Sequence, residues 1–458
     1  MKQIRLKQQG PLLLLLLAFS FLESQAQSNI PINYHRASLP NGLQVLVIED
    51  PTVPLVHFDM VMKFGAIAET AQTDGLAHLY EHMIFTATEN YPTTKSFEEK
   101  TNELGIISNA LTNEESVHYY FSISSTNWKP GLTFFSKGIQ NPIFLPEEIE
   151  LQKKAIKDEL NTFQTDPYYR LNQATNSLLW KEEFSRKNVS GNIDIVQATS
   201  IERLKAFNSQ YHHPKNALLI VAGDITEEEA IAEVEKTFGT WSKEGVAKTD
   251  PYKYSALSEP QYALVEAGEL EYPALLISWQ GPGMDDQKSQ MAASLFFHAI
   301  NLPTSQFYNE IETEDYVFDY HAGIRHGQIA STLFFEFYPD VKTTDDVMVW
   351  FQNKIRDWTQ NQPITDEELA VAKRKWANET IFEEESLSEY ILEIGDRWAI
   401  GGEKMGFEYN SLIQSITVDD IQKLIKEYLT KPAAFGLAID PSKSKKLDKS
   451  IRPKFLPK

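Results

Sequence analysis

Two histidines and a glutamate stand close together in this 458-residue sequence, as His78-x-x-Glu81-His82. On a helix, side chains four residues apart lie on the same face, so the imidazoles of His78 and His82 can converge on one ion. Glu81 lies about 60° to the other side of His78, where its carboxylate can bind a water molecule without becoming a ligand. Zinc suits two imidazoles, one carboxylate and an open water position. The motif therefore predicts a hydrolytic zinc site with Glu81 as the general base. The alternative is a helix that merely exposes these polar side chains to solvent.

A third ligand must come from another element. A long helix is predicted from Pro146, a proline in the first turn, to about Thr165. Glu159 borders the buried stripe of this helix through Ile156 and Phe163, and a partly buried carboxylate needs a partner. The helix also carries other acids, so the residues alone favour Glu159 only weakly. These other acids are Glu147, Glu148, Glu150 and Asp158.

Composition narrows the class of protein. The net charge of −21 argues against nucleic-acid binding, which requires a basic surface. The chain has no cysteine, so a metal site must use histidine, carboxylate or carbonyl ligands. Its length favours two or more domains, and 42% of its residues are hydrophobic, which is enough for a sizeable core.

Residues 1–26 have the pattern of a secretory signal peptide. Basic residues precede the leucine-rich run 11–22, and Ser24-Gln25-Ala26 then predicts cleavage after Ala26. The run is short for a membrane span, so an uncleaved anchor is the weaker alternative. We expect an exported protein with no integral membrane segment after cleavage, in a bacterial periplasm.

The rest of the chain alternates between strand and helix signals. Asn41-Gly42 predicts a hairpin between residues 34–39 and 43–48. A helix is expected to begin near Gly75 and to carry the motif. Further strands are expected at 55–64, 107–111 and 117–123. The pattern favours an α+β sandwich of sheet and helices.

The ends of the two halves of the chain resemble each other. A helix from Ser200 leads through Tyr211 and Pro214 to a strand at 218–222. The same order recurs near the end of the chain, with Thr417, Tyr428, Pro432 and a strand at 435–439. We expect an internal duplication into two homologous α/β-sandwich units, each a mixed or antiparallel sheet packed by helices.

The predicted units are residues 27–248, with the zinc site, and residues 249–458, without one. The boundary falls in the polar stretch 242–259. After an expected strand at 262–279, residues 294–298 of the second unit take the place of the motif, and only His298 survives there.

These features resemble the insulinase/pitrilysin-type inverted zincins, which include the mitochondrial processing peptidases and have H-x-x-E-H as their signature. In that family a glutamate far downstream completes the site, and 76 residues separate His82 from Glu159. The resemblance covers essentially the whole chain after residue 26. It implies one Zn²⁺ per chain, bound by His78, His82 and Glu159.

The resemblance also implies how substrate binds. The family holds an extended peptide on an edge strand beside the zinc, and residues 108–112 are similar to that strand. Asn109 and Ala110 would then contact the substrate. Without the resemblance, an ordinary sheet edge is the simpler interpretation.

One segment departs from the family pattern. Active members usually have an arginine and a downstream tyrosine in the second unit, whereas Glu312 stands here at the arginine position. Tyr316 and Tyr320 are out of register with the expected tyrosine. A glutamate cannot donate to a developing oxyanion. The resemblance therefore implies the zinc-bearing chain of a homo- or heterodimer, in which a sister chain supplies the pair.

The expected function is that of a zinc-dependent endopeptidase acting on peptides or unfolded polypeptides. The alternative is a non-catalytic structural subunit of the same fold, which the complete motif disfavours. A zinc-scavenging protein would need a His-rich tract, and the sequence has none. Tyr211-His212-His213 is expected to end a helix rather than to form a second metal site.

Overall fold

The computed structural model describes residues 33–181, 188–242, 254–268, 270–314 and 317–444. The described residues from Tyr34 onward belong to one unit. The expected leader at residues 1–26 and the expected boundary between residues 248 and 249 lie outside the described residues, and both stay predictions.

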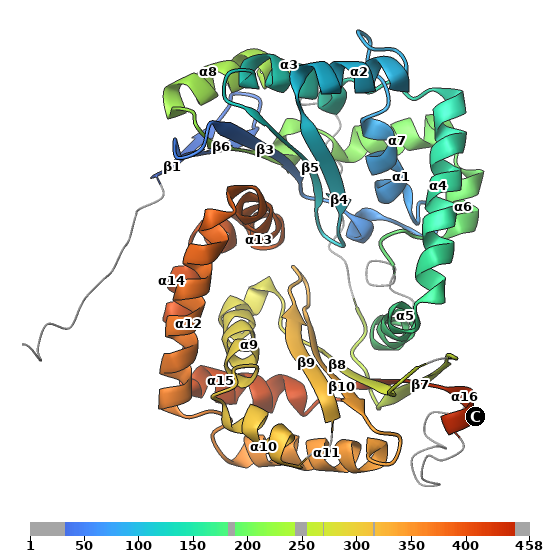
Figure 1. The fold of residues 1–458 in the computed structure, drawn as a ribbon, viewed down its shortest axis with the longest axis vertical. Coiled ribbons are helices and arrows are strands. Elements are labelled where there is room, and N and C mark those ends of the chain that lie inside the picture. Colours follow the sequence, from blue (N-terminus) through green and yellow to red (C-terminus); the bar gives the residue numbers. More distant parts are fainter. Residues whose placement is uncertain (1–32, 182–187, 243–253, 269, 315–316, 445–458) are drawn as a thin grey trace, which may run out of the picture. The chain divides into compact units, whose positions relative to one another are not determined.

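Within the described residues, the strands form two mixed sheets (Figure 1). The first sheet has the order β1-β2-β6-β3-β5-β4, with β2 and β6 parallel. Its strands are β1 (Asn33–Ser38), β2 (Gln44–Glu49), β3 (Leu55–Met62), β4 (Ile107–Thr112), β5 (Val117–Ser124) and β6 (Ala217–Gly223). The second sheet has the order β7-β11-β8-β10-β9, with β7 and β11 parallel. Its strands are β7 (Gln261–Glu266), β8 (Ala274–Gln280), β9 (Val317–Arg325), β10 (Thr332–Pro339) and β11 (Ala434–Ile439).

The two strand orders coincide. When β2-β6-β3-β5-β4 is laid over β7-β11-β8-β10-β9, the pairing and the strand directions agree. This agreement confirms the expected duplication and the α+β class. The single strand expected at 262–279 is wrong, because the segment forms both β7 and β8. Gly268 and Pro273 interrupt the run, and the chain reverses direction between the two strands.

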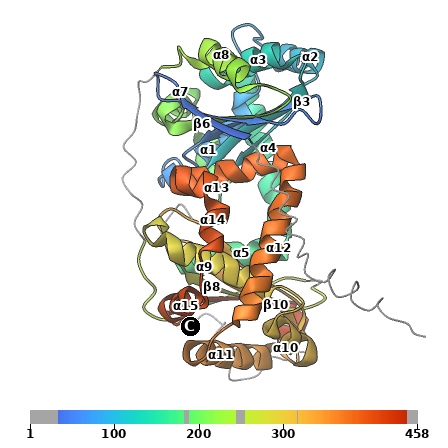
Figure 2. The ribbon, with the colours of Figure 1, turned by 90° about the vertical axis from the view of Figure 1, so that its left-hand side faces the viewer.

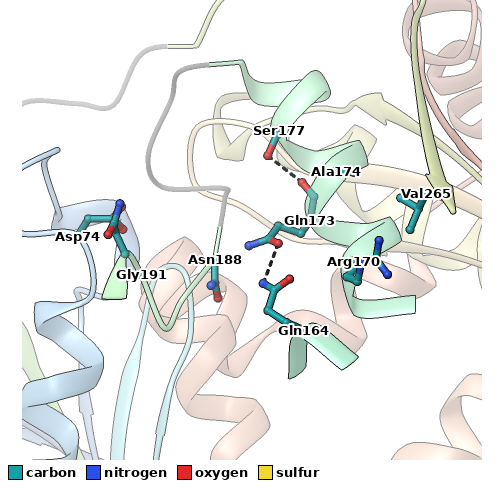
Figure 3. Close-up of a pocket in the computed structure, with 10 residues that line it drawn as sticks. Asp74, Gln164, Arg170, Gln173, Ala174, Ser177, Asn188, Gly191 and Val265 are labelled. Carbon is teal, nitrogen blue, oxygen red and sulfur yellow. Dashed lines mark hydrogen bonds between the residues drawn. The ribbon is translucent and has the colours of Figure 1, made fainter. Parts of the chain in front are cut away.

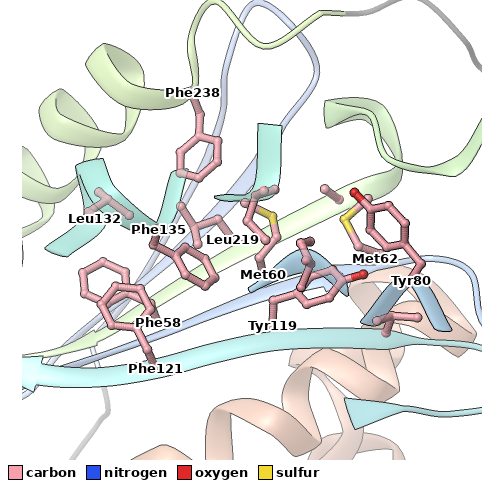
Figure 4. Packing of buried hydrophobic residues seen from close by; sticks show 14 of the residues in the cluster. Phe58, Met60, Met62, Tyr80, Tyr119, Phe121, Leu132, Phe135, Leu219 and Phe238 are labelled. Carbon is pink, nitrogen blue, oxygen red and sulfur yellow. The ribbon is translucent and has the colours of Figure 1, made fainter. Parts of the chain in front are cut away.

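Alternation of side chains explains the core of the first sheet. The expected hairpin turns at Asn41-Gly42, where Gly42 takes a φ of 96° that suits glycine. Every second residue of β3 and β5 points into one apolar cluster, and the rings of Phe58 and Phe121 stack 4.5 Å apart (Figure 4). Tyr80 joins this cluster from the helix that carries the motif. Truncating such a buried ring to alanine costs about 3–5 kcal/mol.

Helices cover the sheets on both faces (Figure 1). The expected helices near Gly75 and at 146–165 are confirmed as α1 and α4. The helix expected from Thr417 is α15, which passes into a π-helical turn at Ile425–Leu429. In the first half of the chain the helices are α1 (Leu76–Ile84), α2 (Thr94–Leu104), α3 (Trp128–Gln140), α4 (Pro146–Thr165), α5 (Pro167–Trp180), α6 (Ile193–Ala198), α7 (Ile201–Tyr211) and α8 (Glu227–Phe238). The later helices are α9 (Gln287–Ile300), α10 (Gln306–Glu314), α11 (Thr344–Gln360), α12 (Asp366–Glu385), α13 (Leu387–Phe407), α14 (Tyr409–Gln414), α15 (Val418–Leu424) and α16 (Pro441–Ser444).

Two helices pack on the sheet of the opposite half. Helix α5 contacts β7, β8 and β11, whereas α13 contacts β3, β5 and β6 (Figure 2). Gly395 of α13 lies so close to the first sheet that an added Cβ would approach Val61 to 2.6 Å. Beside it, His118 bonds to Asp59 at 2.8 Å and to Asp396 of α13 at 3.0 Å. This exchange of helices ties the two halves together.

Candidate metal centre

Helix α1 begins at a glycine that the local backbone requires. Gly75 is its N-cap and takes a φ of 98°, in the left-handed region that side chains disfavour. A Cβ at this position would also meet the carbonyl oxygen of Ser190 at 2.9 Å. The start of the helix is therefore fixed by close packing, and with it the direction of the motif side chains.

A buried carboxylate caps the same end of α1. The oxygens of Glu69 accept hydrogen bonds from the backbone amides of Gly75 and Ala77, each at 2.8 Å. Burial raises the pKa of Glu69 to about 8, although these amide bonds act in the opposite direction. The carboxylate satisfies amide groups that the first turn of a helix leaves without a partner.

Three ligand atoms converge between α1 and α4. The Nε2 atoms of His78 and His82 lie 3.2 Å apart, and each lies 3.8 Å from Oε2 of Glu159. In the part of the chain that the structure describes, this is the one group of three side chains placed to hold a metal ion. Helices α1 and α4 contact each other directly, which brings together residues far apart in the sequence (Figure 1).

The donor set fits a zinc ion. Ligands about 2.0–2.2 Å from a tetrahedral zinc lie roughly 3.3 Å from one another, close to the spacing seen here. Nδ1 of His82 donates to Oε1 of Gln152 at 3.1 Å, so its Nε2 keeps the lone pair toward the ligand group. Burial and the neighbouring His82 lower the pKa of His78 to about 3. The imidazole of His78 is then neutral and able to bind a metal.

Glu81 stands beside this group without belonging to it. Its Oε2 accepts a hydrogen bond of 2.5 Å from Oγ1 of Thr112, the last residue of β4. Burial raises the pKa of Glu81 above its usual value, whereas the Thr112 bonds and the charge of His82 lower it. A carboxylate held next to a metal and outside its ligand set is what a general base requires.

The predicted substrate-binding residues lie on an edge strand. Strand β4 is the last strand of the first sheet, and Asn109 is exposed there. Ala110 pairs with Tyr119 of the core, and therefore faces α1 on the same side as Thr112. Asn109 pairs with Tyr120 and faces the opposite side, and its Oδ1 accepts the amide of Ala110 at 2.9 Å. The structure brings Ala110 to the side of Glu81 and leaves the side chain of Asn109 on the other face.

The second half has the equivalent helices with a different set of side chains. Glu379 is the fourteenth residue of α12, as Glu159 is of α4, and its Oε2 lies 3.6 Å from Nε2 of His298. Ser294 and Phe297 of α9 stand at the positions of His78 and Glu81. The counterpart of the metal site thus lacks one ligand and the base.

The residues at the departure from the family pattern do not form an arginine–tyrosine pair. Glu312 is exposed on α10. Tyr320 is buried, and its hydroxyl donates to the carbonyl oxygen of Ile300 at 2.7 Å. Tyr316 lies outside the described residues.

Tyr211-His212-His213 ends a helix, as expected. Tyr211 is the last residue of α7, and the His212 ring that follows it bonds to the hydroxyl of Tyr119.

A polar cavity of about 490 Å³ lies near the same elements (Figure 3). It is bounded by the segment before α1, the end of α4, helix α5 and residues 188–192. Gln164 and Gln173 bond across it at 3.2 Å. The predicted zinc ligands do not line it, so it is a neighbouring space and not the candidate metal site.

Sequence reasoning missed three side chains that hold the site in place. Gln152 precedes Glu159 by two helical turns and so lies on the same face of α4, a spacing that could have identified it. Thr112 ends the predicted edge segment and faces the same side as Ala110, which alternation could have shown. No sequence pattern pointed to Glu69.

Comparison with known families matches two successive parts of the chain to two related domains. The family described as Insulinase (Peptidase family M16) matches residues 44–192, which include the predicted zinc ligands and Glu81. The family described as Peptidase M16 inactive domain matches residues 198–375, which include Ser294 and Phe297. Together the two matches cover more than two thirds of the sequence.

Individual relatives carry names that agree. A protein from Rickettsia felis named as an uncharacterized zinc protease is 24% identical over 394 residues, covering 85% of this chain and 93% of its own. The zinc protease PqqE of Helicobacter pylori is 27% identical over 222 residues, covering 46% of this chain. That match spans 48% of the Helicobacter protein, about half of its length.

Solved structures share the fold. A protease from Helicobacter pylori superposes with a TM-score of 0.79 at 19% identity, covering 89% of this chain and 99% of that one. The first half of the periplasmic protease PqqL from Escherichia coli gives a TM-score of 0.74 at 18% identity, covering 92% and 94%. Among the described residues, no helix has the length and apolar character needed to cross a membrane.

Proposed function

This chain belongs to peptidase family M16, the insulinase family, and is a zinc metallopeptidase; from this premise we propose that it is an endopeptidase acting on peptides or unfolded polypeptides. The observation that carries the proposal is the convergence of His78, His82 and Glu159 within bonding distance of one ion, with Glu81 held beside them. Their position next to an edge strand supports a polypeptide substrate.

The proposed mechanism assigns a separate task to each group. His78, His82 and Glu159 would hold zinc, which when bound polarises a peptide carbonyl and acidifies water. Glu81 accepts the proton of the attacking water and later gives it to the leaving amine. The hydroxyl of Thr112 occupies one acceptor position of the Glu81 carboxylate and leaves other lone pairs for that water. Burial, which raises the pKa of Glu81, makes its carboxylate a stronger base.

An extended substrate would pair with the free edge of β4. Backbone pairing of this kind binds many sequences, because it uses groups that every peptide has. We propose Asn109 and Ala110 as substrate contacts. The Ala110 amide now donates to Oδ1 of Asn109, so a bound peptide would replace the side-chain oxygen with its own carbonyl. Asn109 is exposed.

We further propose that the active form is a two-chain complex. Glu312 is exposed at the family's arginine position, and the hydroxyl of Tyr320 is already bonded inside the core. A sister chain that supplies an arginine and a tyrosine would complete the substrate site in a heterodimer, whereas both copies in a homodimer would carry Glu312 at that position. Co-expression with such a chain should raise peptidase activity sharply, and equal activity with and without it would refute this proposal.

The proposed location is the periplasm of a bacterium, by export and removal of residues 1–26. The basic start, the leucine-rich run and Ser24-Gln25-Ala26 support it, and a structural relative is named as a periplasmic protease. Sequencing the amino terminus of the protein recovered from the periplasm should give Gln27 as its first residue.

A non-catalytic assembly subunit of the same fold is the second candidate. A subunit without catalysis has no need of a separate carboxylate held beside three ligand atoms, and both features are present here. The two candidates differ in one measurable property, which is turnover that depends on Glu81.

The deciding experiment measures cleavage of a mixture of unstructured peptides by the purified, zinc-loaded chain. Glu81→Gln is the matched control, because it should keep zinc and lose nearly all turnover. Cleavage that disappears in this variant would establish the peptidase. Absence of cleavage with one zinc per chain would favour the two-chain complex, to be tested with the partner present. A chain that binds no zinc, or a Glu81→Gln variant as active as the parent, would sink the proposed function.

A further inference from the structure

Thr112 connects the edge strand to the general base. Its side chain is buried, at 7% exposure, and lies on the face of the sheet toward α1. Its hydroxyl donates to Oε2 of Glu81 at 2.5 Å, and its backbone amide bonds to the same carboxylate. Two donors from one residue therefore hold a side chain that belongs to a different element.

Such a link restricts the carboxylate in a way that α1 alone cannot. The terminal torsion of a glutamate side chain is broad, so a helix fixes its backbone and leaves the carboxylate plane free to turn. The bonds from Thr112 limit that freedom, and the hydroxyl bond fixes the position of Oε2 of Glu81. A misplacement of about 1 Å in a reacting group can cost roughly 100-fold in rate.

We propose that Thr112 is a positioning residue for Glu81, which sets the carboxylate of the base relative to a peptide paired on β4. The inference rests on the proposed function, since it gives Glu81 the role of base. Because Thr112 belongs to the strand that would bind substrate, peptide and base share one support. The role belongs to the hydroxyl and not to the bulk of the side chain.

The kinetic test compares Thr112→Val, which keeps the shape and loses the hydroxyl, with Thr112→Ser, which keeps the hydroxyl. We expect Thr112→Val to lower kcat about 10- to 100-fold with KM within about twofold of the parent, because the loss acts on the transition state. Thr112→Ser should recover most of kcat. Zinc content should stay at one per chain in both variants.

A second readout does not depend on activity. In the zinc-free protein, Thr112→Val should lower Tm, because the buried Glu81 carboxylate loses a donor. The same substitution should leave Tm nearly unchanged in a Glu81→Ala background, where there is no carboxylate to hold. Equal drops in the two backgrounds would show that the hydroxyl serves only local packing.

The outcomes separate this inference from the proposed function. An active parent, an inactive Glu81→Gln variant and a fully active Thr112→Val variant would overturn the role of Thr112 alone. A rise in KM with unchanged kcat would also overturn it, by assigning Thr112 to substrate binding. A parent that is inactive with and without a partner would instead count against the proposed function, and the Tm comparison would still test the link.

Discussion

Replacing Gln152 by leucine should weaken zinc binding without touching a ligand. Oε1 of Gln152 accepts Nδ1–H of His82 at 3.1 Å, which fixes the tautomer and the plane of that imidazole. Loss of such an outer partner costs 10- to 100-fold in metal affinity in general. The His82 side chain is 23% exposed, so water can replace part of the bond, and we expect about tenfold, or about 1.4 kcal/mol. Gln152→Glu should tighten binding, because a charged acceptor makes the stronger bond.

Competition with a chromophoric chelator at fixed pH would measure both variants. Leu151→Gln is the matched control, since Leu151 neighbours Gln152 on α4 but is 58% exposed. Its affinity should equal that of the parent. If Gln152→Leu and Gln152→Glu both bind zinc as the parent does, the reasoning from tautomer and orientation is refuted.

Three further predictions follow from charge, surface and duplication. Burial lowers the pKa of His118, but Asp59 and Asp396 outweigh it and raise the pKa to about 10. The stabilisation by charged His118 is complete below about pH 6.5 and is lost as pH rises through about 10. In urea unfolding, the free energy of unfolding should therefore fall by a few kcal/mol over this range. Asp396→Asn should make this fall smaller. Leu111 is 42% exposed on the face of β4 away from Glu81. Leu111→Ser should therefore lower kcat/KM roughly fivefold for peptides that place an apolar residue against position 111. The kcat/KM for polar peptides should not change. In elemental analysis, His298→Ala should keep one zinc per chain, whereas His82→Ala should lose it.

The site was predictable from the sequence as far as local periodicity extends. Residues four apart on α1 must share a face, and the bounds of α4 followed from its proline and its apolar stripe. The choice of Glu159 needed the family resemblance, because the packing of α1 on α4 is a tertiary fact. Helical spacing and strand alternation place Gln152 and Thr112 on the correct faces, but the partners that they bond to lie on other elements, which a local pattern does not identify.

The fold shows the same limit. The Asn41-Gly42 hairpin and the repeated helix–strand endings were visible as turn signals and apolar runs. The split of residues 262–279 into two strands was not predicted, because apolar residues lie on both sides of Gly268 and Pro273. The packing of α5 and α13 on the sheet of the opposite half could not be predicted from either helix. An apolar stripe shows that one face of a helix is buried, but it does not show which surface that face packs against.

That exchange predicts that the half without its own metal site stabilises the half that has one. The face of the first sheet toward α13 carries apolar residues that are fully buried, among them Leu46, Val61 and Ile220. Uncovering three such side chains costs roughly 5–9 kcal/mol, comparable with the whole stability of a typical domain. A chain ending before Leu387 would therefore lose the support of β3 and β6, and with it the strands that pack against α1.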